Sequence, residues 1–527
     1  MAPLPNRITA PQAAPAAKYQ PSPQQAAVYD WTTNSTGSAV IEAVAGAGKT
    51  TTLINLLTRT TGTVAFMAYN KKIAEEIAVK AAPLNLGNRV RIGTVHSFGF
   101  AALRTSCPRT KVDGKKLITI AKRLIENKRI PVELHSFVLK AVALAKQAGI
   151  GAMTKIDDAK AWAEMIAHHA IDELLPEDFD LGAGIRAAVT LLTASNAMAD
   201  QIIDFDDMVY LPLQRRLKLQ TYDWVLLDEA QDTNATRRAL ACKLLAPGGR
   251  MVAVGDPAQA IYGFTGADSD SLDLIRADFN AITLPLTVSY RCPKAVVAEA
   301  RQWVQHIQPA DDAIEGSVER IDEDTFWAET YATLTPDDAI LCRNTAPLVA
   351  AAYRLIRNGV GCYIEGRDIG TGLIKLATKW KTAATVADLR DRLRKWSKAE
   401  IKRAQDKSQD AQAARVDDQT STLLEIMSAL PDDAPIFSVQ TAINNIFGDT
   451  PAGERPRVVT LSTIHKSKGR EWKRVLWWGA NAFQPSPFAR QAWQQGQERN
   501  LMYVAATRAM ETLIHVTVEK RERRKDQ

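Results

Sequence analysis

The chain has 527 residues, of which 46% are hydrophobic and 24% charged, the composition of an ordinary globular protein with more than one domain. Its 66 Lys and Arg residues exceed its 59 Asp and Glu residues, and the net charge of +7 mildly favours a polyanionic partner. Its five cysteines form no C-x-x-C pair, which excludes a readable zinc site, and no apolar run reaches the roughly 18 residues of a membrane span. We therefore expect no membrane partner and a cytoplasmic protein, associated with the nucleoid, or a nuclear protein in a eukaryotic host.

The N-terminal half alternates short apolar runs with helical sequence. Residues 1–18 are rich in Ala and Pro and predict a disordered leader. Four nearly continuous apolar runs then predict strands buried on both faces of a parallel sheet: AVIEAVA, TVAFMAY, WVLLDEA and RMVAVGD. Between residues 101 and 200 helix-like sequence replaces this pattern. It indicates an α/β domain over 19–100 and 201–283 that is interrupted by a mainly helical insertion.

The C-terminal half repeats this organisation. A second parallel sheet is predicted by the runs AILCRN, CYIEG, VVTLST, RVLWWGA and TLIHVTV. The charged, Ala-rich stretch 376–454 predicts a second, smaller helical insertion, and residues 520–527 form a charged tail. The second α/β domain is therefore expected over 284–375 and 455–519.

The segment AVAGAGKT predicts a phosphate-binding loop between a strand and a helix. Gly46 and Gly48 allow backbone N–H groups to turn toward phosphate oxygens. Lys49 can reach the β- and γ-phosphates, and the Thr50 hydroxyl can bind Mg²⁺. The strict pattern G-x-x-x-x-G-K-[ST] begins with glycine, where this chain has Ala43. The segment therefore predicts a site for ATP and Mg²⁺ that departs from the pattern at one position.

The run WVLLDEAQD predicts the carboxylates that such a site needs. An apolar strand delivers Asp228 and Glu229 at its C-terminal end, where the loops of an α/β sheet gather ligands. We expect Asp228 to bind Mg²⁺ and Glu229 to act as the general base for the attacking water. A single pair of this kind could also be a strand that ends in a solvated acidic turn. The phosphate-binding loop favours the catalytic interpretation.

Further motifs give a resemblance to a known family. The segments AGAGKT, DEAQD and VGDPAQAIYGFTGA follow one another, and around them occur SPQQAAV, MAYNKKIAEEI, GTVHSFG, SYR, ILCRN, TIHKSKGREW and RNLMYVAATRA. In this order they resemble the superfamily 1 DNA helicases of the UvrD/Rep/PcrA type. The amino-acid sequence of several of these motifs is most similar to that of the helicase core of eukaryotic F-box DNA helicases. The resemblance implies two RecA-like P-loop domains, each with a helical insertion, and an ATP hydrolase coupled to DNA.

The resemblance also implies roles for residues around the nucleotide. The phosphate cradle would comprise Ala45, Gly46, Ala47, Gly48, Lys49, Thr50 and Thr51. The adenine edge, the face of the base and the ribose would be contacted by Gln24, Tyr290 and Glu471, respectively. Gln259 would sense the γ-phosphate, and Arg291 and Arg508 would neutralise charge in the transition state.

A second set of residues would line the polymer. Tyr262 and Phe264 stand two apart in YGF, so on an extended segment both rings face one side and can stack on successive bases. An isolated aromatic pair would more commonly fill a core. Other positions that match strand-lining residues of the family are Tyr69, Asn70, Lys71, Thr94, His96, Arg343, Asn344, Thr463 and His465. Their polar and basic groups suit phosphate contacts that do not read sequence.

The chain departs from the family at three places. Thr265 replaces the arginine that usually follows the aromatic residue, 376–454 is shorter than its counterpart, and few residues follow Arg508, where related enzymes have a strand-separating hairpin. Movement along DNA is thus better supported than unwinding.

The expected function is that of a monomeric 3′-to-5′ single-stranded DNA translocase and helicase in DNA repair, recombination or replication, which binds single strands and single-strand/duplex junctions. One alternative is a translocase that strips proteins from single-stranded DNA. A second is a nucleotide-gated DNA-binding protein that does not cycle. An RNA substrate also remains open, because stacking and phosphate contacts do not report the 2′-hydroxyl group.

Overall fold

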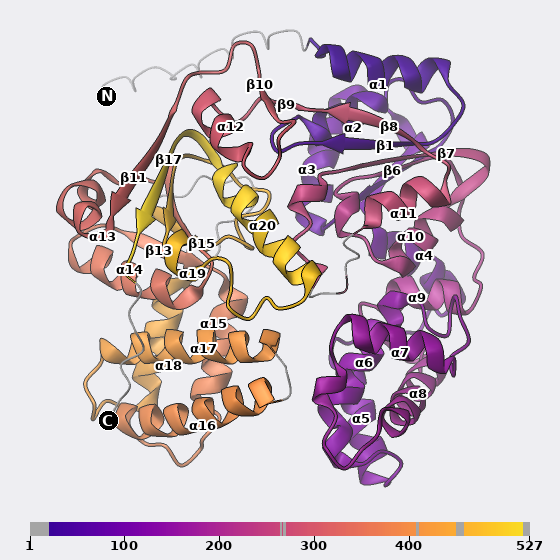
Figure 1. The fold of residues 1–527 in the computed structure, drawn as a ribbon. Helices are drawn as coiled ribbons and strands as arrows, with labels where there is room; N and C mark the ends of the chain where they lie inside the picture. Colours follow the sequence, from indigo (N-terminus) through magenta and orange to yellow (C-terminus); the bar gives the residue numbers. More distant parts are fainter. Residues whose placement is uncertain (1–19, 264–265, 267–269, 407–409, 449–457, 520–527) are drawn as a thin grey trace, which may run out of the picture.

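The computed structural model describes residues 20–263, 266, 270–406, 410–448 and 458–519. The expected leader at 1–18, the expected tail at 520–527 and the candidate Phe264 lie outside these described residues. The described part contains two large parallel sheets and two groups of helices beside them (Figure 1). Within it, no helix is both long and apolar enough to cross a membrane.

The first sheet has six strands, all parallel, in the order β3-β2-β6-β7-β1-β8. Their bounds are β1 (Ala39–Ala43), β2 (Val64–Ala68), β3 (Val90–Thr94), β6 (Tyr222–Leu227), β7 (Leu245–Gly255) and β8 (Ile282–Leu286). The helices of this domain are α1 (Pro23–Asn34), α2 (Lys49–Leu56), α3 (Lys71–Ala81), α10 (Ala235–Lys243) and α11 (Ser271–Asp278). The inner strands are almost wholly buried, which confirms the parallel sheet predicted from the apolar runs.

The second sheet has seven strands, also all parallel, in the order β11-β17-β16-β12-β15-β13-β14. Their bounds are β11 (Ser317–Asp322), β12 (Asp338–Cys342), β13 (Cys362–Glu365), β14 (Phe447–Gly448), β15 (Val459–Thr463), β16 (Trp472–Trp478) and β17 (Ala509–Thr517). Its helices are α12 (Lys294–Ala300), α14 (Thr345–Arg357), α15 (Arg367–Ala377), α19 (Ala480–Phe483) and α20 (Ala492–Ala506). A short parallel pair, β9 (Val288–Ser289) and β10 (Gln308–Pro309), lies beside the connection between the sheets.

The first insertion is a helical unit with its own core. It contains α4 (Val95–Ser106), α5 (Lys116–Glu126), α6 (His135–Ala148), α7 (Ala159–His168), α8 (Leu181–Ala197), α9 (Asp207–Gln214) and the strands β4 (Lys111–Val112) and β5 (Ile202–Ile203). Phe137, Trp162 and Leu191 are fully buried in that core. The ammonium groups of Lys116 and Lys146 form buried ion pairs with Asp207. Each charge is thereby paired, which a buried charge requires.

The second insertion packs differently. It consists of α16 (Val386–Asp406), α17 (Asp410–Ser428) and α18 (Ile436–Ile446), and α17 lies against α14 of the second domain. Leu423 and Ile443 of these helices share one hydrophobic cluster with Leu348 and Leu461 of the second domain. This insertion is therefore an extension of that domain's core.

Three expected boundaries fall inside single elements. The boundary at 100/101 lies within α4, the one at 375/376 lies within α15, and the one at 283/284 lies within β8, whose Leu286 is paired with Ala43 of β1. The first sheet therefore continues beyond residue 283, because its edge strand is completed only at Leu286.

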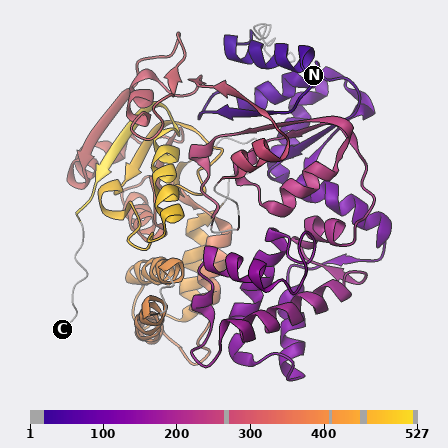
Figure 2. The ribbon, with the colours of Figure 1, turned by 45° about the vertical axis from the view of Figure 1, so that its right-hand side comes forward.

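The two domains are packed against each other, with α20 of the second domain facing the first sheet (Figures 1 and 2). One hydrophobic cluster includes Ile41 and Phe66 of the first sheet together with Val475 and Val504 of the second domain. The interface is therefore a continuous apolar contact. It brings the ends of β1 and β6 close to α20.

Candidate active site and nucleic-acid interface

The phosphate-binding loop connects β1 to α2. Gly46 and Gly48 both have φ of +76°, a left-handed conformation that glycine adopts without strain. A Cβ atom on Gly46 would lie 2.6 Å from Cβ of Arg291 and 2.6 Å from Oγ of Ser289, so the loop also touches the chain that leads into the second domain. Ala43, where the strict pattern has glycine, is the buried last residue of β1. Helix α2 begins at Lys49, so its N-terminal N–H groups are placed to bind phosphate.

The carboxylates predicted from DEAQD lie opposite this loop. The Thr50 hydroxyl donates to Oδ2 of Asp228 at 3.2 Å. Asp228 is 2% exposed, and burial, followed by the charge of Glu229, raises the pKa of its carboxyl group to about 7. Burial also opposes ionisation of Glu229, but the charges of Lys49 and Lys468 outweigh it and lower the pKa of that carboxyl group. Glu229 is thus held ionised, as a general base must be.

The same oxygen atoms suit a magnesium ion. Thr50 and Asp228 offer one hydroxyl and one carboxylate, and Mg²⁺ prefers hard oxygen ligands of this kind together with substrate phosphates. The raised pKa of Asp228 reflects a buried carboxylate whose negative charge is incompletely compensated by protein cations. These two residues therefore fit the expected ion.

A chain of side-chain contacts leads away from Glu229. The Gln231 amide donates to Oε2 of Glu229, and Oε1 of Gln231 accepts from the backbone N–H of Asp256 at 3.1 Å. Asp256 in turn accepts from Nε2 of Gln259 at 2.7 Å. Gln259 is therefore connected to the Glu229 carboxylate through two intervening residues, Gln231 and Asp256.

Lys468 joins this chain from the second domain. Its ammonium group lies 2.6 Å from Oδ2 of Asp232, 2.7 Å from the carbonyl oxygen of Gln259 and 3.8 Å from Oε2 of Glu229. It also lies 5.1 Å from the centroid of the Tyr262 ring. Lys468 thus contacts the acidic cluster of Glu229 and Asp232 and, at the same time, the aromatic loop that carries Tyr262.

The two expected arginine fingers have different surroundings. Arg291 forms an ion pair with Glu471, which is the residue expected at the ribose. Arg508 is 1% exposed, and its guanidinium group donates to the carbonyl oxygens of Val504 and Arg470. Burial, together with the charge of Arg291, lowers the pKa of Arg508 to about 10, so it remains a cation at neutral pH.

The residues expected to contact the base, Tyr290 and Gln24, lie on segments next to the phosphate-binding loop. Tyr290 is 51% exposed, and its backbone N–H donates to the carbonyl oxygen of Gly46 at 2.9 Å. The Gln24 amide exchanges two hydrogen bonds with Thr287, one to its hydroxyl and one from its backbone N–H, each at 2.8 Å. Gln24 is therefore held in place by the connection that leads to Tyr290.

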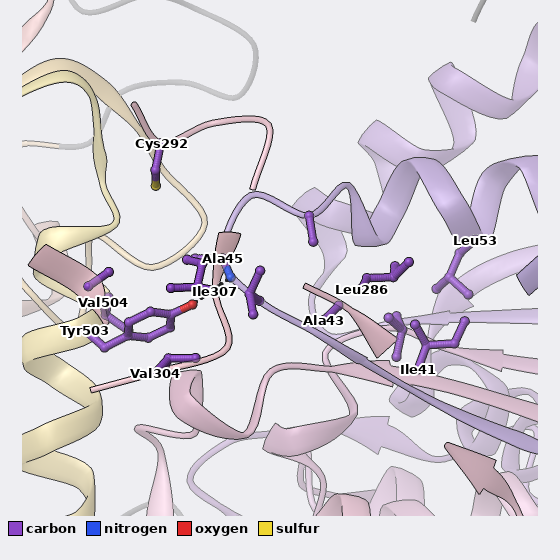
Figure 3. Close-up of a cluster of buried hydrophobic side chains, with 14 of the residues drawn as sticks. Ile41, Ala43, Ala45, Leu53, Leu286, Cys292, Val304, Ile307, Tyr503 and Val504 are labelled. Atoms are coloured by element: carbon purple, nitrogen blue, oxygen red, sulfur yellow. Dashed lines mark hydrogen bonds between the residues drawn. The ribbon is translucent and has the colours of Figure 1, made fainter. Parts of the chain in front are cut away.

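Tyr503 is a further residue of the site. Its hydroxyl group accepts a hydrogen bond from the backbone N–H of Ala45 at 2.9 Å (Figure 3). Tyr503 lies on α20, so this bond ties the phosphate-binding loop directly to the second domain. Both residues are fully buried.

The expected polymer-binding residues form an aromatic pair and its surroundings. The rings of Tyr69 and Tyr262 stack with centroids 5.8 Å apart and planes 8° apart. The Tyr262 hydroxyl donates to the carbonyl oxygen of His465 at 3.2 Å. The guanidinium group of Arg237 lies 5.8 Å from the Tyr69 ring centroid. These contacts hold the pair between the two domains.

Several other candidates have partners within the protein. Asn70 and Thr94 cap the N-termini of α3 and α4, and Arg343 forms an ion pair with the buried Glu498. Burial, and then a neighbouring arginine, lowers the pKa of His96 to about 4 and that of His465 to about 3, so both rings are neutral at pH 7. Lys71 is exposed, and Thr463 is buried with its hydroxyl accepting from the backbone N–H of Lys466.

A groove of about 1910 Å³ is lined by His465, whose carbonyl oxygen accepts from Tyr262 of the aromatic pair. It lies between the two insertions and the second domain, including the segment before α20, and Arg343 and Asn344 are also among its lining residues. Its size suits a polymer strand better than a small metabolite.

Sequence reasoning assigned no role to several residues of the site, among them Gln231, Lys468 and Tyr503. Gln231 and Lys468 lie inside DEAQD and TIHKSKG, and Tyr503 lies inside RNLMYVAATRA. Their positions in these motifs were the available signal. Their partners come from distant segments, so spacing alone does not reveal their contacts.

The fold and the site define a two-domain P-loop nucleotide hydrolase with RecA-like sheets. A family model described as the UvrD/REP helicase N-terminal domain matches residues 22–280, and one described as the UvrD-like helicase C-terminal domain matches residues 284–520. The chain therefore belongs to the UvrD/Rep/PcrA type of superfamily 1 helicases.

Curated relatives agree with this assignment. The ATP-dependent DNA helicase Rep of Escherichia coli is 33% identical over 111 residues, which are 19% of this chain and 16% of that protein. The ATP-dependent DNA helicase PcrA of Leuconostoc citreum is 22% identical over 301 residues, which are 51% of this chain and 37% of that protein. A probable DNA helicase II homologue of Rickettsia felis is 24% identical over 298 residues, 51% of this chain and 43% of that protein. The chain spans less than half of the length of each of these relatives.

Proposed function

We propose that this protein is an ATP-driven motor that moves 3′ to 5′ along single-stranded DNA and separates duplex DNA at junctions. The observation that supports coupling between ATP hydrolysis and DNA is the position of Lys468. Its ammonium group contacts Asp232 and Gln259 beside the catalytic carboxylate and faces the ring of Tyr262. A change at the nucleotide is therefore transmitted to the aromatic loop through direct contacts.

Hydrolysis follows from the groups around the loop. Lys49 and the N-terminal N–H groups of α2 bind the phosphates, and Glu229 takes a proton from the attacking water. Mg²⁺, when it is bound by Thr50 and Asp228, supplies positive charge at the phosphate oxygens. Arg291 and Arg508 neutralise the charge that develops in the transition state. Because both arginines follow the first sheet in sequence and lie at its border with the second domain, hydrolysis depends on how closely the domains approach.

Movement follows from the polymer-binding surfaces. Tyr262 belongs to the first domain, whereas Arg343, Asn344 and His465 belong to the second. If the domains grip the strand alternately as the nucleotide changes, the strand advances through the groove. The 3′-to-5′ direction, the preference for junctions, a monomeric motor and a role in repair, recombination or replication rest on the family alone.

The first experiment is steady-state ATP hydrolysis with no polymer, single-stranded DNA, single-stranded RNA or blunt duplex DNA. We expect single-stranded DNA to stimulate hydrolysis at least tenfold, and Lys49→Ala to abolish it, because the phosphates lose their lysine. Equal rates with and without every polymer would refute the motor. Stimulation by RNA but not by DNA would identify single-stranded RNA as the substrate.

Unwinding requires a separate measurement. Duplexes with a 3′ tail, a 5′ tail or blunt ends are incubated with ATP, and strand separation is compared with displacement of streptavidin from either end of a single strand. We expect separation of the 3′-tailed duplex and displacement from the 5′ end. Displacement without separation would favour the stripping translocase, and neither activity would favour the protein that does not cycle.

A further inference from the structure

Trp493 is a partly exposed aromatic residue near the start of α20, outside the motif blocks. It lines both the 1910 Å³ groove and a smaller pocket of about 360 Å³, as Gln497 does. The indole ring therefore stands where the two cavities meet.

The ring is held by contacts from three directions. Its Nε1 group donates to the side chain of Gln491. The His168 ring of α7 lies nearly parallel to it, with centroids 6.2 Å apart and planes 19° apart. A Cβ atom on Gly263 would lie 3.3 Å from Cε3 of Trp493, so the residue after Tyr262 lies against the indole ring. Trp493 is thus the next aromatic platform beyond the Tyr69 and Tyr262 pair.

The groove is not uniformly basic, so binding of a nucleic-acid strand there would need contacts other than phosphate attraction. Among the residues that line it, acidic side chains outnumber lysines and arginines, and Arg343 is already paired with Glu498. Attraction of phosphates therefore contributes less here than in a uniformly basic channel. Stacking on an aromatic ring does not depend on that charge, and it is worth about 1–3 kcal/mol per base.

The smaller pocket has the chemistry of a nucleobase site. Trp303 and Trp493 provide indole surfaces, the amides of Gln302 and Gln497 provide donors and acceptors, and the exposed Arg499 also lines it. The amide nitrogen of Asn500, another lining residue, already donates to the carbonyl oxygens of Pro257 and Ala260. Its volume is at the low end of ligand pockets, which suits one base rather than a duplex.

We propose that Trp493 is a base-stacking platform of the second domain, and that the 360 Å³ pocket beside it receives one unpaired nucleobase of the bound single strand. The proposal rests on the proposed function, because it takes the strand as the ligand. His168 is stacked nearby on the first insertion, so an entering base meets the insertion and the second domain together. Trp493 thereby provides a sequence-independent contact at the wall of the groove.

Photocrosslinking tests the contact directly. An oligonucleotide that carries 5-iododeoxyuridine at successive positions is bound to the full chain, irradiated and mapped by mass spectrometry. We expect a crosslink to Trp493 from one narrow range of positions and its loss in Trp493→Ala. Crosslinks that map only to other residues would overturn the proposal.

Affinity measurements separate stacking from structure. We expect Trp493→Ala to weaken binding of single-stranded DNA by at least about 5-fold, and Trp493→Phe to restore most of it. The slope of log affinity against log salt should stay unchanged, because no phosphate contact is lost. Trp380→Ala, a partly buried tryptophan between α15 and α16, is the matched control and should bind normally. Equal weakening by both substitutions, or none by either, would overturn the proposal.

Failure of this inference is distinguishable from failure of the proposed function. If single-stranded DNA stimulates ATP hydrolysis by the wild-type protein and Trp493→Ala binds normally, the motor stands and the platform is wrong. If single-stranded DNA neither binds nor stimulates the wild-type protein, the proposed function fails, and the assignment of this pocket fails with it.

Discussion

The two halves of the nucleotide site are built in different ways. The first half comprises residues 45–50 and 228–232, and its groups contact one another, as in the hydrogen bond between Thr50 and Asp228. The second half comprises residues 290–291, 468–471 and 503–508. Its cations already have partners within the protein, such as Glu471 for Arg291 and Asp232 for Lys468.

This difference indicates how the site works. The first half is preorganised by the ends of β1 and β6, so it can bind phosphates without rearrangement. In the mechanism that we propose, the second half exchanges its present partners for phosphate oxygens before it stabilises the transition state. Exchanging protein partners for phosphate oxygens has a free energy that differs between the ATP-bound and ATP-free states. This difference would link hydrolysis to movement of the domains.

The largest expected effect comes from removing the arginines of the second half. Arg291→Ala and Arg508→Ala should each lower kcat by roughly 10³-fold, because transition-state charge is left unneutralised. Their stabilities should differ. Arg508→Ala should also lower the free energy of unfolding by roughly 2–4 kcal/mol, since it removes buried hydrogen bonds and leaves a cavity, whereas the loss for Arg291→Ala should stay within about 1 kcal/mol.

Single-turnover hydrolysis and urea unfolding measure these two quantities. Arg320→Ala, which removes an exposed side chain paired with Glu299 on the same domain, is the control. Glu299 keeps its contact with His515, so neither quantity should change. A normal kcat in both site variants would show that the second half does not contribute to catalysis. Equal loss of stability in both would contradict the structural distinction between them.

A methyl group placed between the halves should have the next largest effect. Gly46→Ala forces alanine to a φ of +76° and puts its Cβ atom 2.6 Å from side chains of Arg291 and Ser289. We expect it to lower the free energy of unfolding by roughly 3 kcal/mol and to weaken ATP binding, measured by urea unfolding and by nucleotide titration.

Gly359→Ala separates strain from contact. Gly359 has a φ of +81° with nothing within 4 Å of an added Cβ atom, so its substitution tests the backbone conformation alone. It should cost about 1 kcal/mol and leave ATP binding unchanged. If both variants lose the same stability and both bind ATP normally, the halves do not meet at Gly46.

The same contrast explains what the sequence could predict of the fold. Strands such as β2 and β15 are buried on both faces, so their continuous apolar runs identified them. None of the four edge strands of the two large sheets was identified as a strand. The strand β14 has only two residues, and β3, β8 and β11 are half-exposed and carry polar residues. The strand β8 also includes Pro285, which an edge strand tolerates.

The site divides in a similar way. The motifs located the phosphate-binding loop and the carboxylates, because their chemistry lies in consecutive residues at strand ends. The contacts of Lys468 and Tyr503 depend on how the two sheets pack, which no spacing records. The predicted DNA contacts of Asn70 and Thr94 stay predictions, since in this structure their side chains cap helices.

The ion pair between Asp232 and Lys468 gives the halves a pH-dependent connection. Burial raises the pKa of Asp232 to about 6 despite the attraction of Lys468. Because this pKa lies above that of the unfolded chain, the group favours folding below about pH 4, and this contribution is lost as the pH rises through 6. The variant Asp232→Asn has no carboxyl group to titrate, so it does not lose this stability as the pH rises. The difference in unfolding free energy, variant minus wild type, should therefore increase by about 2 kcal/mol from pH 4 to 7, measured by urea unfolding. A difference that stays constant across that range would show that Asp232 is ionised throughout.

The smallest expected effect concerns the hydroxyl group of Tyr503. Tyr503→Phe leaves the buried N–H of Ala45 without its acceptor, which should cost about 1–2 kcal/mol of stability. Tyr210→Phe is the matched control, because its hydroxyl accepts from Asn196 within the first insertion, away from the interface between the sheets. Both variants should lose similar stability in urea unfolding, but only Tyr503→Phe should raise KM for ATP, by about 2- to 5-fold, since only its bond positions the phosphate-binding loop. An unchanged KM in Tyr503→Phe would mean that the loop holds its shape without the second domain, and the first half would then be complete by itself.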